Sequence, residues 1–330
     1  MKTLIKNTIL FGIMLMLLVT VGIFQSWNVA LAILNLCLIS AIMTMGVNIQ
    51  WGYAGLFNAG VMGFTALGGI AAVVISIPPV QSAWLAGGSR AMLGLLIGVI
   101  SIFLVVVVWK KTAKLGRIRY WLTALMVIGG YALMRMVIDP AIEAIEAIEP
   151  AKTGFLGGFG LPVIFSWIVG GAFAASVAWV VGRVSLGLRS DYLAIATLGI
   201  SEIIIYFLKY EEWLTRGVKN VNGIPRPVPY EIDLQKTLWL QEWAERFEMP
   251  VIELSSIIVK ISYASLFITV LLVIFYLSET ALKSPWGRMM RAIRDNETAA
   301  NAMGKNVTWR HLQVFVLGSA VVGMAGAMLT

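Results

Sequence analysis

Three arginines recur at every third position of one segment, Ser284 to Lys305, which lies between two strongly apolar stretches. Arg288, Arg291 and Arg294 would share one side of a helix, where guanidinium groups can bind carboxylates or phosphates. Apolar residues follow the i, i+3, i+4, i+7 pattern on another face: Trp286, Met289, Met290 and Ile293. The pattern predicts an amphipathic element that contacts another molecule at the membrane surface. The alternative is an interfacial helix whose arginines rest on anionic lipid.

The same segment carries start and stop signals for two short helices. Pro285 suits a first helical turn. Asn296 can cap a second helix that runs to Met303, and Gly304 can close it. Asn306 is a further capping residue, placed where the next apolar stretch begins.

Polar side chains inside or beside the apolar stretches form a second candidate set. Asn48 precedes, and Asn58 lies within, the stretch 51–77, which is rich in small residues that include Gly55 and Gly60. Polar groups at membrane depth need partners, so these residues are candidates for a translocation path or for contacts between packed helices. Repeated small residues favour a helix that packs closely against others.

Glu202 is an ionisable residue within another apolar stretch, with Thr197 and Ser201 nearby. A carboxylate inside a membrane span is costly and is a functional candidate by default. We leave two interpretations open: Glu202 lines a path, or it pairs with a donor on another helix.

Catalytic and metal-binding patterns are absent from the sequence. The chain has one histidine, His311, and one cysteine, Cys37, and these are not clustered. It contains no Walker A sequence, no dinucleotide-binding glycine motif and no nucleophile motif. We therefore predict no catalytic residue, no metal site and no cofactor. If the protein drives an energy-consuming process, the energy would come from another chain or from an ion gradient.

The composition is that of an integral membrane protein. Hydrophobic residues make up 59% of the chain and charged residues only 13%, against roughly 25% charged residues in soluble domains. The net charge of +8 does not indicate nucleic-acid binding, because membrane proteins collect Lys and Arg in cytoplasmic loops.

The hydropathy pattern predicts an all-α, polytopic transmembrane helical bundle. The nine predicted spans are 8–24, 28–47, 51–77, 91–109, 120–138, 164–182, 191–208, 256–277 and 312–329. The 110–119 loop holds five basic and no acidic residues, whereas 139–163 and 209–255 hold more acidic than basic residues. This asymmetry places the N-terminus and the 110–119 loop in the cytoplasm.

Three blocks of sequence carry a resemblance to a known family. The first, Gly46 to Gly60, reads GVNIQWGYAGLFNAG; the second, Leu188 to Ile203, reads LRSDYLAIATLGISEI, with Ser190 where the family usually has glycine. The third runs from Ser284 to Thr308. With these blocks in this order, the chain resembles the permease subunits of bacterial branched-chain amino acid ABC importers, of the LivM type.

The resemblance implies a single permease domain over residues 1–330, with a cytoplasmic loop at 110–119 and a periplasmic loop at 209–255. It implies that 284–305 docks onto an ATPase, and the positions that match the family pattern there are Glu297, Ala299, Ala300 and Gly304. Family members usually continue beyond Gly323 to Met328, so the C-terminal part of the family fold is expected to be missing.

The implied partners are two ABC ATPase subunits, a second homologous permease subunit, a periplasmic substrate-binding protein and the lipid of a bacterial inner membrane. The implied cargo is leucine, isoleucine and valine. One alternative is the same machine with urea, short amides or other amino acids as cargo. Another is an ion-coupled secondary carrier with Glu202 as its proton or sodium site, and a structural or lipid-sensing protein is the third.

Overall fold

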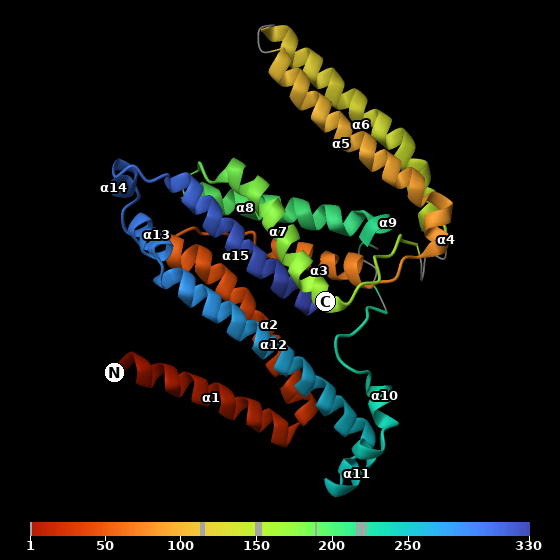
Figure 1. Ribbon diagram of the computed structural model, residues 1–330, viewed down its shortest axis with the longest axis vertical. Helices are drawn as coiled ribbons and strands as arrows, with labels where there is room; N and C mark the ends of the chain where they lie inside the picture. The colour runs from red at the N-terminus through yellow and green to blue at the C-terminus, as the bar shows by residue number, and fades with distance from the viewer. Residues whose placement is uncertain are drawn as a thin grey trace. The chain divides into compact units, whose positions relative to one another are not determined.

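The computed structural model describes residues 2–112, 116–148, 154–188, 190–215, 217, 221 and 223–330. These residues form helices joined by loops, and the described part contains no strand (Figure 1). The first helices are α1 (Lys2–Phe24), α2 (Trp27–Asn48), the π-helix η1 (Ile49–Tyr53), α3 (Val61–Ser76), α4 (Gln81–Ala83), the π-helix η2 (Trp84–Gly88), α5 (Ser89–Lys111) and α6 (Arg117–Glu146). They are followed by α7 (Val163–Ser185), α8 (Ser190–Tyr210), α9 (Glu212–Thr215), α10 (Glu231–Gln235), α11 (Leu238–Arg246), α12 (Val251–Lys283), α13 (Pro285–Asp295), α14 (Glu297–Ala302) and α15 (Val307–Leu329). The predicted all-α fold is confirmed.

Seven helical stretches in the described residues are long and apolar enough to cross a membrane. They are Trp27–Tyr53, Gln81–Lys111, Arg117–Glu146, Val163–Ser185, Tyr192–Tyr210, Val251–Lys283 and Val307–Leu329. The predicted count was nine. The other two predicted spans fall on shorter apolar stretches, Thr8–Phe24 within α1 and Val61–Ser76. The predicted span 51–77 is short because residues 55–60 are not helical, so its helix begins at Val61 and not at Trp51.

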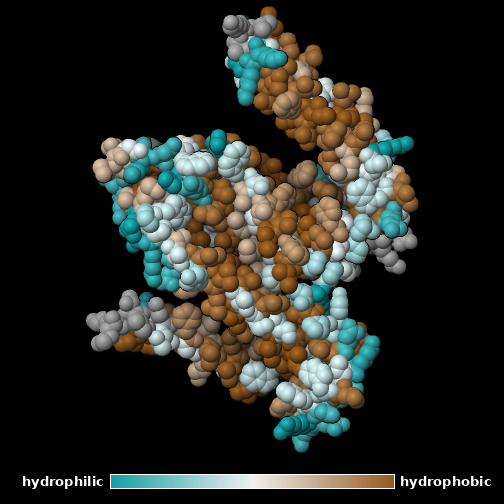
Figure 2. All heavy atoms as spheres, in the orientation of Figure 1, coloured by the Kyte–Doolittle hydropathy of each residue, from teal (hydrophilic) through white to brown (hydrophobic). Residues whose placement is uncertain are grey.

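Large apolar side chains cover the outside of these helices. On the face shown in Figure 2, hydrophobic residues follow α5 and α6 along their length, whereas hydrophilic residues gather around α13, α14 and α11. Leu85 is 90% exposed, and Trp121 is 79% exposed. Apolar surface on this scale fits the interior of a bilayer and not water. The chain is a multi-pass membrane protein.

One compact unit comprises Met1–Ile75, Pro162–Ile205 and Ile224–Thr330, and α15 lies at its centre. α15 packs against α7 and α2 through small residues. A Cβ added at Gly323 of α15 would lie 2.3 Å from the Cβ of Ala174 and 2.7 Å from the carbonyl oxygen of Gly170, both on α7. A Cβ added at Gly46 of α2 would likewise lie 2.6 Å from the carbonyl oxygen of Gly318. These approaches need residues without large side chains, which explains the glycine-rich sequence.

The other compact unit comprises Ser76–Leu161 and Tyr206–Gly223. Its main feature is the helical hairpin of α5 and α6, in which Gly94 faces Ile138. The base of the hairpin is an apolar cluster that includes Ala83, Ala141 and Trp213. This cluster joins the hairpin to α9, far along the chain.

Candidate functional site

The chain interrupts its helix between α2 and α3 at the first block of resemblance. α2 continues into the π-helix η1, and the chain then leaves the helix at Gly55, whose φ of +72° suits glycine. The amide of Leu56 donates to the carbonyl of Gln50 at 3.0 Å, and residues 55–60 are extended or irregular until Val61 starts α3. A break of this kind at membrane depth frees backbone groups that must find other partners.

Two buried amide side chains satisfy part of this requirement. Gln50 is 1% exposed, and its Nε2 donates to the carbonyl of Phe315 at 2.9 Å and to Ser319 Oγ at 3.0 Å. Its Oε1 accepts from Asn58 Nδ2 at 2.9 Å, and Asn58 Oδ1 accepts from the amide of Gly60 at 2.9 Å. The two amides therefore connect both sides of the break to α15.

Two hydroxyl groups of α8 complete the arrangement at the start of α3. Thr197 Oγ1 accepts from the amide of Ala59 at 3.1 Å, and Ser201 Oγ accepts from the amide of Gly63 at 2.8 Å. The first N–H groups of a helix have no partner within it, and these hydroxyls supply partners from another helix. We call Gln50, Asn58, Thr197 and Ser201 the polar cluster.

Among the residues predicted for a path or for packing, Asn58, Gly60, Thr197 and Ser201 lie together in or beside the polar cluster. Asn48 does not: its side chain is exposed and lines a groove beside α12. Gly55 lies beside Arg294, whose Cγ is 3.4 Å from the position that a Cβ of residue 55 would take.

Glu202 follows Ser201 in sequence, but Ser201 is buried and Glu202 lies on an exposed face of α8. Its side chain is exposed, and the same face of the helix presents Ile195 and Leu198, which are also exposed. The structure therefore separates Glu202 from the polar cluster and places it on an otherwise apolar surface.

The predicted element at 284–305 forms two helices. Ser284 caps α13, Asn296 Oδ1 accepts from the amide of Ala299 at 2.9 Å and caps α14, and Gly304 has a φ of +75°. Of the predicted apolar face, Met290 and Ile293 are almost completely buried. The predicted cap at Asn296 is confirmed, and α14 ends at Ala302, one residue before the predicted Met303.

The three arginines of α13 bind backbone carbonyls. Arg288 Nη1 donates to the carbonyl of Lys283 at 3.0 Å, and Arg291 Nη2 donates to that of Leu282 at 3.3 Å. These carbonyls belong to the last turn of α12, where helix carbonyls lack partners and positive charge is favoured. Arg294 Nη1 donates to the carbonyl of Gly52 in η1. α13 is thus bonded both to α12 and to the interrupted helix.

The remaining residues predicted to couple to an ATPase lie on or just after α14. Glu297, Ala299 and Gly304 are exposed, and Ala300 is half-buried. No group of three or more potential metal ligands from His, Cys, Asp and Glu occurs in the described ranges.

Comparison with known proteins identifies the family. The model of a family described as "Branched-chain amino acid transport system / permease component" matches residues 121–330. The chain belongs to this permease family. The match covers α7, α8 and α12–α15, which include residues 284–305 and part of the polar cluster.

Curated relatives agree with this assignment. The permease is 28% identical over 162 residues to the "High-affinity branched-chain amino acid transport system permease protein LivM" of Escherichia coli K12, which is 48% of this chain and 38% of the relative. The protein of the same name from Salmonella typhimurium is 28% identical over 160 residues, covering 48% and 37%. A "Probable branched-chain amino acid transport permease protein LivM" of Methanocaldococcus jannaschii is 26% identical over 159 residues, covering 47% and 39%. The matched part of the permease thus spans less than two fifths of each relative. No solved structure matches.

Gln50 is the member of the polar cluster that sequence reasoning missed. It sits within the first block of resemblance as a polar residue next to an apolar run, which was a usable signal. Its partners Phe315 and Ser319 lie more than 260 positions away, so no local pattern reveals them.

We predict that Asn58→Ala destabilises the permease by about 1–3 kcal/mol, because it leaves the buried Oε1 of Gln50 without its donor. The measurement is chemical unfolding of the purified protein in mild detergent. Asn48→Ala is the matched control, since Asn48 is an exposed asparagine close to the same break. Equal stability losses for the two variants would contradict the role of the polar cluster.

Proposed function

We propose that the chain is the membrane-spanning permease subunit of an ATP-driven importer, and that it passes branched-chain amino acids from a periplasmic binding protein to the cytoplasm. In this proposal residues 1–330 act as one permease domain that pairs with a second homologous permease and two ATPase subunits. ATP hydrolysis takes place on those separate subunits. Support comes from the family match and from the names of the relatives, which state branched-chain amino acid transport.

The observation that carries the coupling part of the proposal is the position of α13 and α14. The tip formed by α14 is exposed, small and polar, while α13 is anchored by Met290 and Ile293 in the bundle. Small exposed residues such as Ala299 permit a close approach by a partner. Arg294 then connects that contact to the interrupted helix through Gly52.

The orientation follows from charge. The basic loop 110–119 and the basic α13 lie on the cytoplasmic side in this proposal, and the loop 209–255 lies in the periplasm. α10 and α11 then cover the periplasmic end of α12, where Leu240 and Ala244 are buried against Leu254. A binding protein would approach from that side.

The cargo path is proposed to run along the exposed face of α8 that carries Glu202. A carboxylate facing lipid is strongly unfavourable, and the second permease would cover it. An ion-coupled carrier would use the same carboxylate as its ion site. The structure of α13 and α14 supports an ATP-driven importer and gives no such support to an ion-coupled carrier.

Docking is tested with Ala299→Arg. We expect at least about tenfold less ATPase to co-purify with the tagged permease, because a charge placed in a close-packed interface lacks a partner. The variant should fold normally, since Ala299 is exposed. Glu245→Lys, at an exposed site on α11, is the control and should leave co-purification unchanged. Equal ATPase recovery with the unmodified permease, Ala299→Arg and Glu245→Lys would contradict the docking role of α14.

Transmission is tested with Arg294→Gln. This change removes the bond from α13 to Gly52, which as a charged hydrogen bond contributes about 1.5–3 kcal/mol. We expect transport into proteoliposomes to fall severalfold while ATPase co-purification is kept. Arg288→Gln, which loses only a contact to Lys283, should transport better than Arg294→Gln. The opposite ranking of these two variants would contradict the transmission role.

The partner of the Glu202 face is tested with a photo-crosslinker. Cys37 is the single cysteine in the chain, so Cys37→Ser gives a background in which Gly199→Cys, one turn before Glu202, can be labelled with benzophenone maleimide. We expect an adduct with the second permease, and a much lower yield from Leu272→Cys on α12, which is 60% exposed. An intramolecular adduct with α5 or α6, or adducts with lipid alone, would contradict the proposed path.

A further inference from the structure

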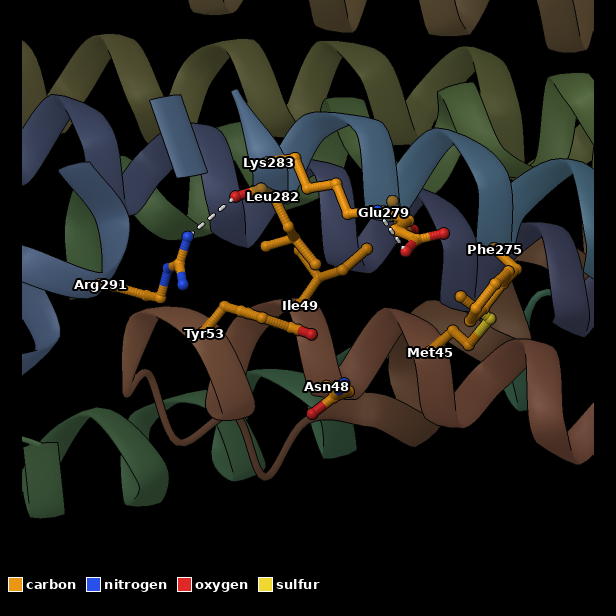
Figure 3. A pocket seen from close by; sticks show the side chains of 10 residues that line it. Met45, Asn48, Ile49, Tyr53, Phe275, Glu279, Leu282, Lys283 and Arg291 are labelled. Atoms are coloured by element: carbon orange, nitrogen blue, oxygen red, sulfur yellow. Dashed lines mark hydrogen bonds and ion pairs between the residues drawn. The ribbon is translucent and has the colours of Figure 1, made fainter. Parts of the chain in front are cut away.

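A groove of about 440 Å³ opens between α2 and η1 on one side and the end of α12 and α13 on the other. It does not involve the polar cluster or the exposed tip of α14. Figure 3 shows its two ends, with Arg291 and Tyr53 at one and Met45 and Phe275 at the other.

The two ends of the groove differ in polarity. The apolar end is formed by Met45 and Phe275, and the two helices that carry them are both long enough to span a membrane. The polar end is formed by Tyr53, Lys283 and Arg291, at the level where α12 ends and α13 begins. A ligand that fills the groove must therefore have an apolar part directed into the membrane and a polar part at its surface.

The charges at the polar end favour an anion. Glu279 is the acidic residue of the groove, and its Oε1 lies 2.7 Å from Lys283 Nζ, so its charge is paired. Arg291 donates to a neutral partner, the carbonyl of Leu282, at 3.3 Å. A guanidinium has five N–H donors, and Arg291 is exposed. The polar end thus offers a cation with unused donors and a net positive charge.

Phosphate is the anion that suits a guanidinium fork, and acyl chains suit the apolar end. Basic pockets between transmembrane helices on the cytoplasmic side bind anionic lipid headgroups. We propose that this groove binds an anionic phospholipid of the inner leaflet, with its phosphate at Arg291 and its acyl chains along Met45 and Phe275. The leaflet rests on the orientation in the proposed function, whereas the binding chemistry does not.

Lipid in this position has a consequence for α13. The groove is lined by residues of α2, η1, α12 and α13. A ligand in the groove therefore contacts α13 and also the membrane-spanning helices on which α13 packs. Bound lipid would hold α13 against α2 and α12, so the movement of α13 would depend on the lipid composition of the membrane.

The test uses the purified full chain in neutral detergent, with tail-labelled phosphatidylglycerol and tail-labelled phosphatidylcholine as probes of binding. We expect phosphatidylglycerol to bind more tightly than phosphatidylcholine. Arg291→Gln should weaken phosphatidylglycerol binding about fivefold, since one basic residue near an anionic lipid contributes about that factor. Lys283→Gln should also weaken it, because Glu279 would then face the headgroup unpaired.

Arg288→Gln is the matched control: Arg288 lies on the same helix, bonds a neighbouring carbonyl and does not line the groove. It should bind phosphatidylglycerol like the unmodified protein. Glycerol 3-phosphate distinguishes a lipid from a free phosphate, and we expect it not to displace the labelled lipid.

Three results would overturn the proposal: equal affinity for the two lipids, equal losses for Arg288→Gln and Arg291→Gln, or displacement by glycerol 3-phosphate at concentrations close to those of the lipid. These measurements need no ATPase. A negative result therefore leaves the docking role of α14 unaffected, and failed ATPase co-purification leaves the lipid site unaffected.

Discussion

A helix can be interrupted inside a bilayer only where every freed polar group finds a partner within the protein. The chain meets this constraint between α2 and α3 by using side chains from elements far apart in sequence. Gln50 bonds to α15 and Asn58 bonds to Gln50. The hydroxyls of α8 accept from one amide just before α3 and one in its first turn. Each bond is modest alone, but leaving any of these groups unpaired would be costly. The packing of α2, α3, α8 and α15 against one another in the first unit therefore depends on the polar cluster.

Close packing of α15 makes that cluster possible. Gln50 can bond Phe315 and Ser319 only if α2 and α15 approach closely, and Gly46 and Gly318 permit this contact. In lipid no hydrophobic driving force brings helices together, so van der Waals packing and hydrogen bonds must do so. The hydrogen bonds of Gln50 depend on the glycines, because a larger residue at Gly318 would occupy the space of the Gln50 side chain.

Sequence reasoning succeeded where the cause is local. α13 and α14 were predicted with their caps because Pro285, Asn296 and Gly304 act on adjacent turns. It failed at the break after Gly55, because hydropathy averages over a window and cannot detect one residue with positive φ in a run of small apolar residues. It also missed Gln50 and could not place Glu202, since the partners and the exposed faces of these residues depend on contacts between distant helices. The cargo preference likewise has no local signature in the chain.

The bonds of α13 support the proposal that a partner bound at the surface acts on the membrane-spanning helices. Arg291 bonds to the last turn of α12, Arg294 bonds to η1, and Met290 and Ile293 on the same helix are buried. A force on α14 cannot be absorbed by α13 alone, because rotating it would expose its buried face or break bonds to both neighbours. In the proposed function Gly52 receives this force through Arg294; it lies two residues from Gln50 and three from the bend at Gly55. A displacement there acts on the part of the helix that is already interrupted, where backbone dihedral angles can change without the loss of a continuous helical hydrogen-bond ladder.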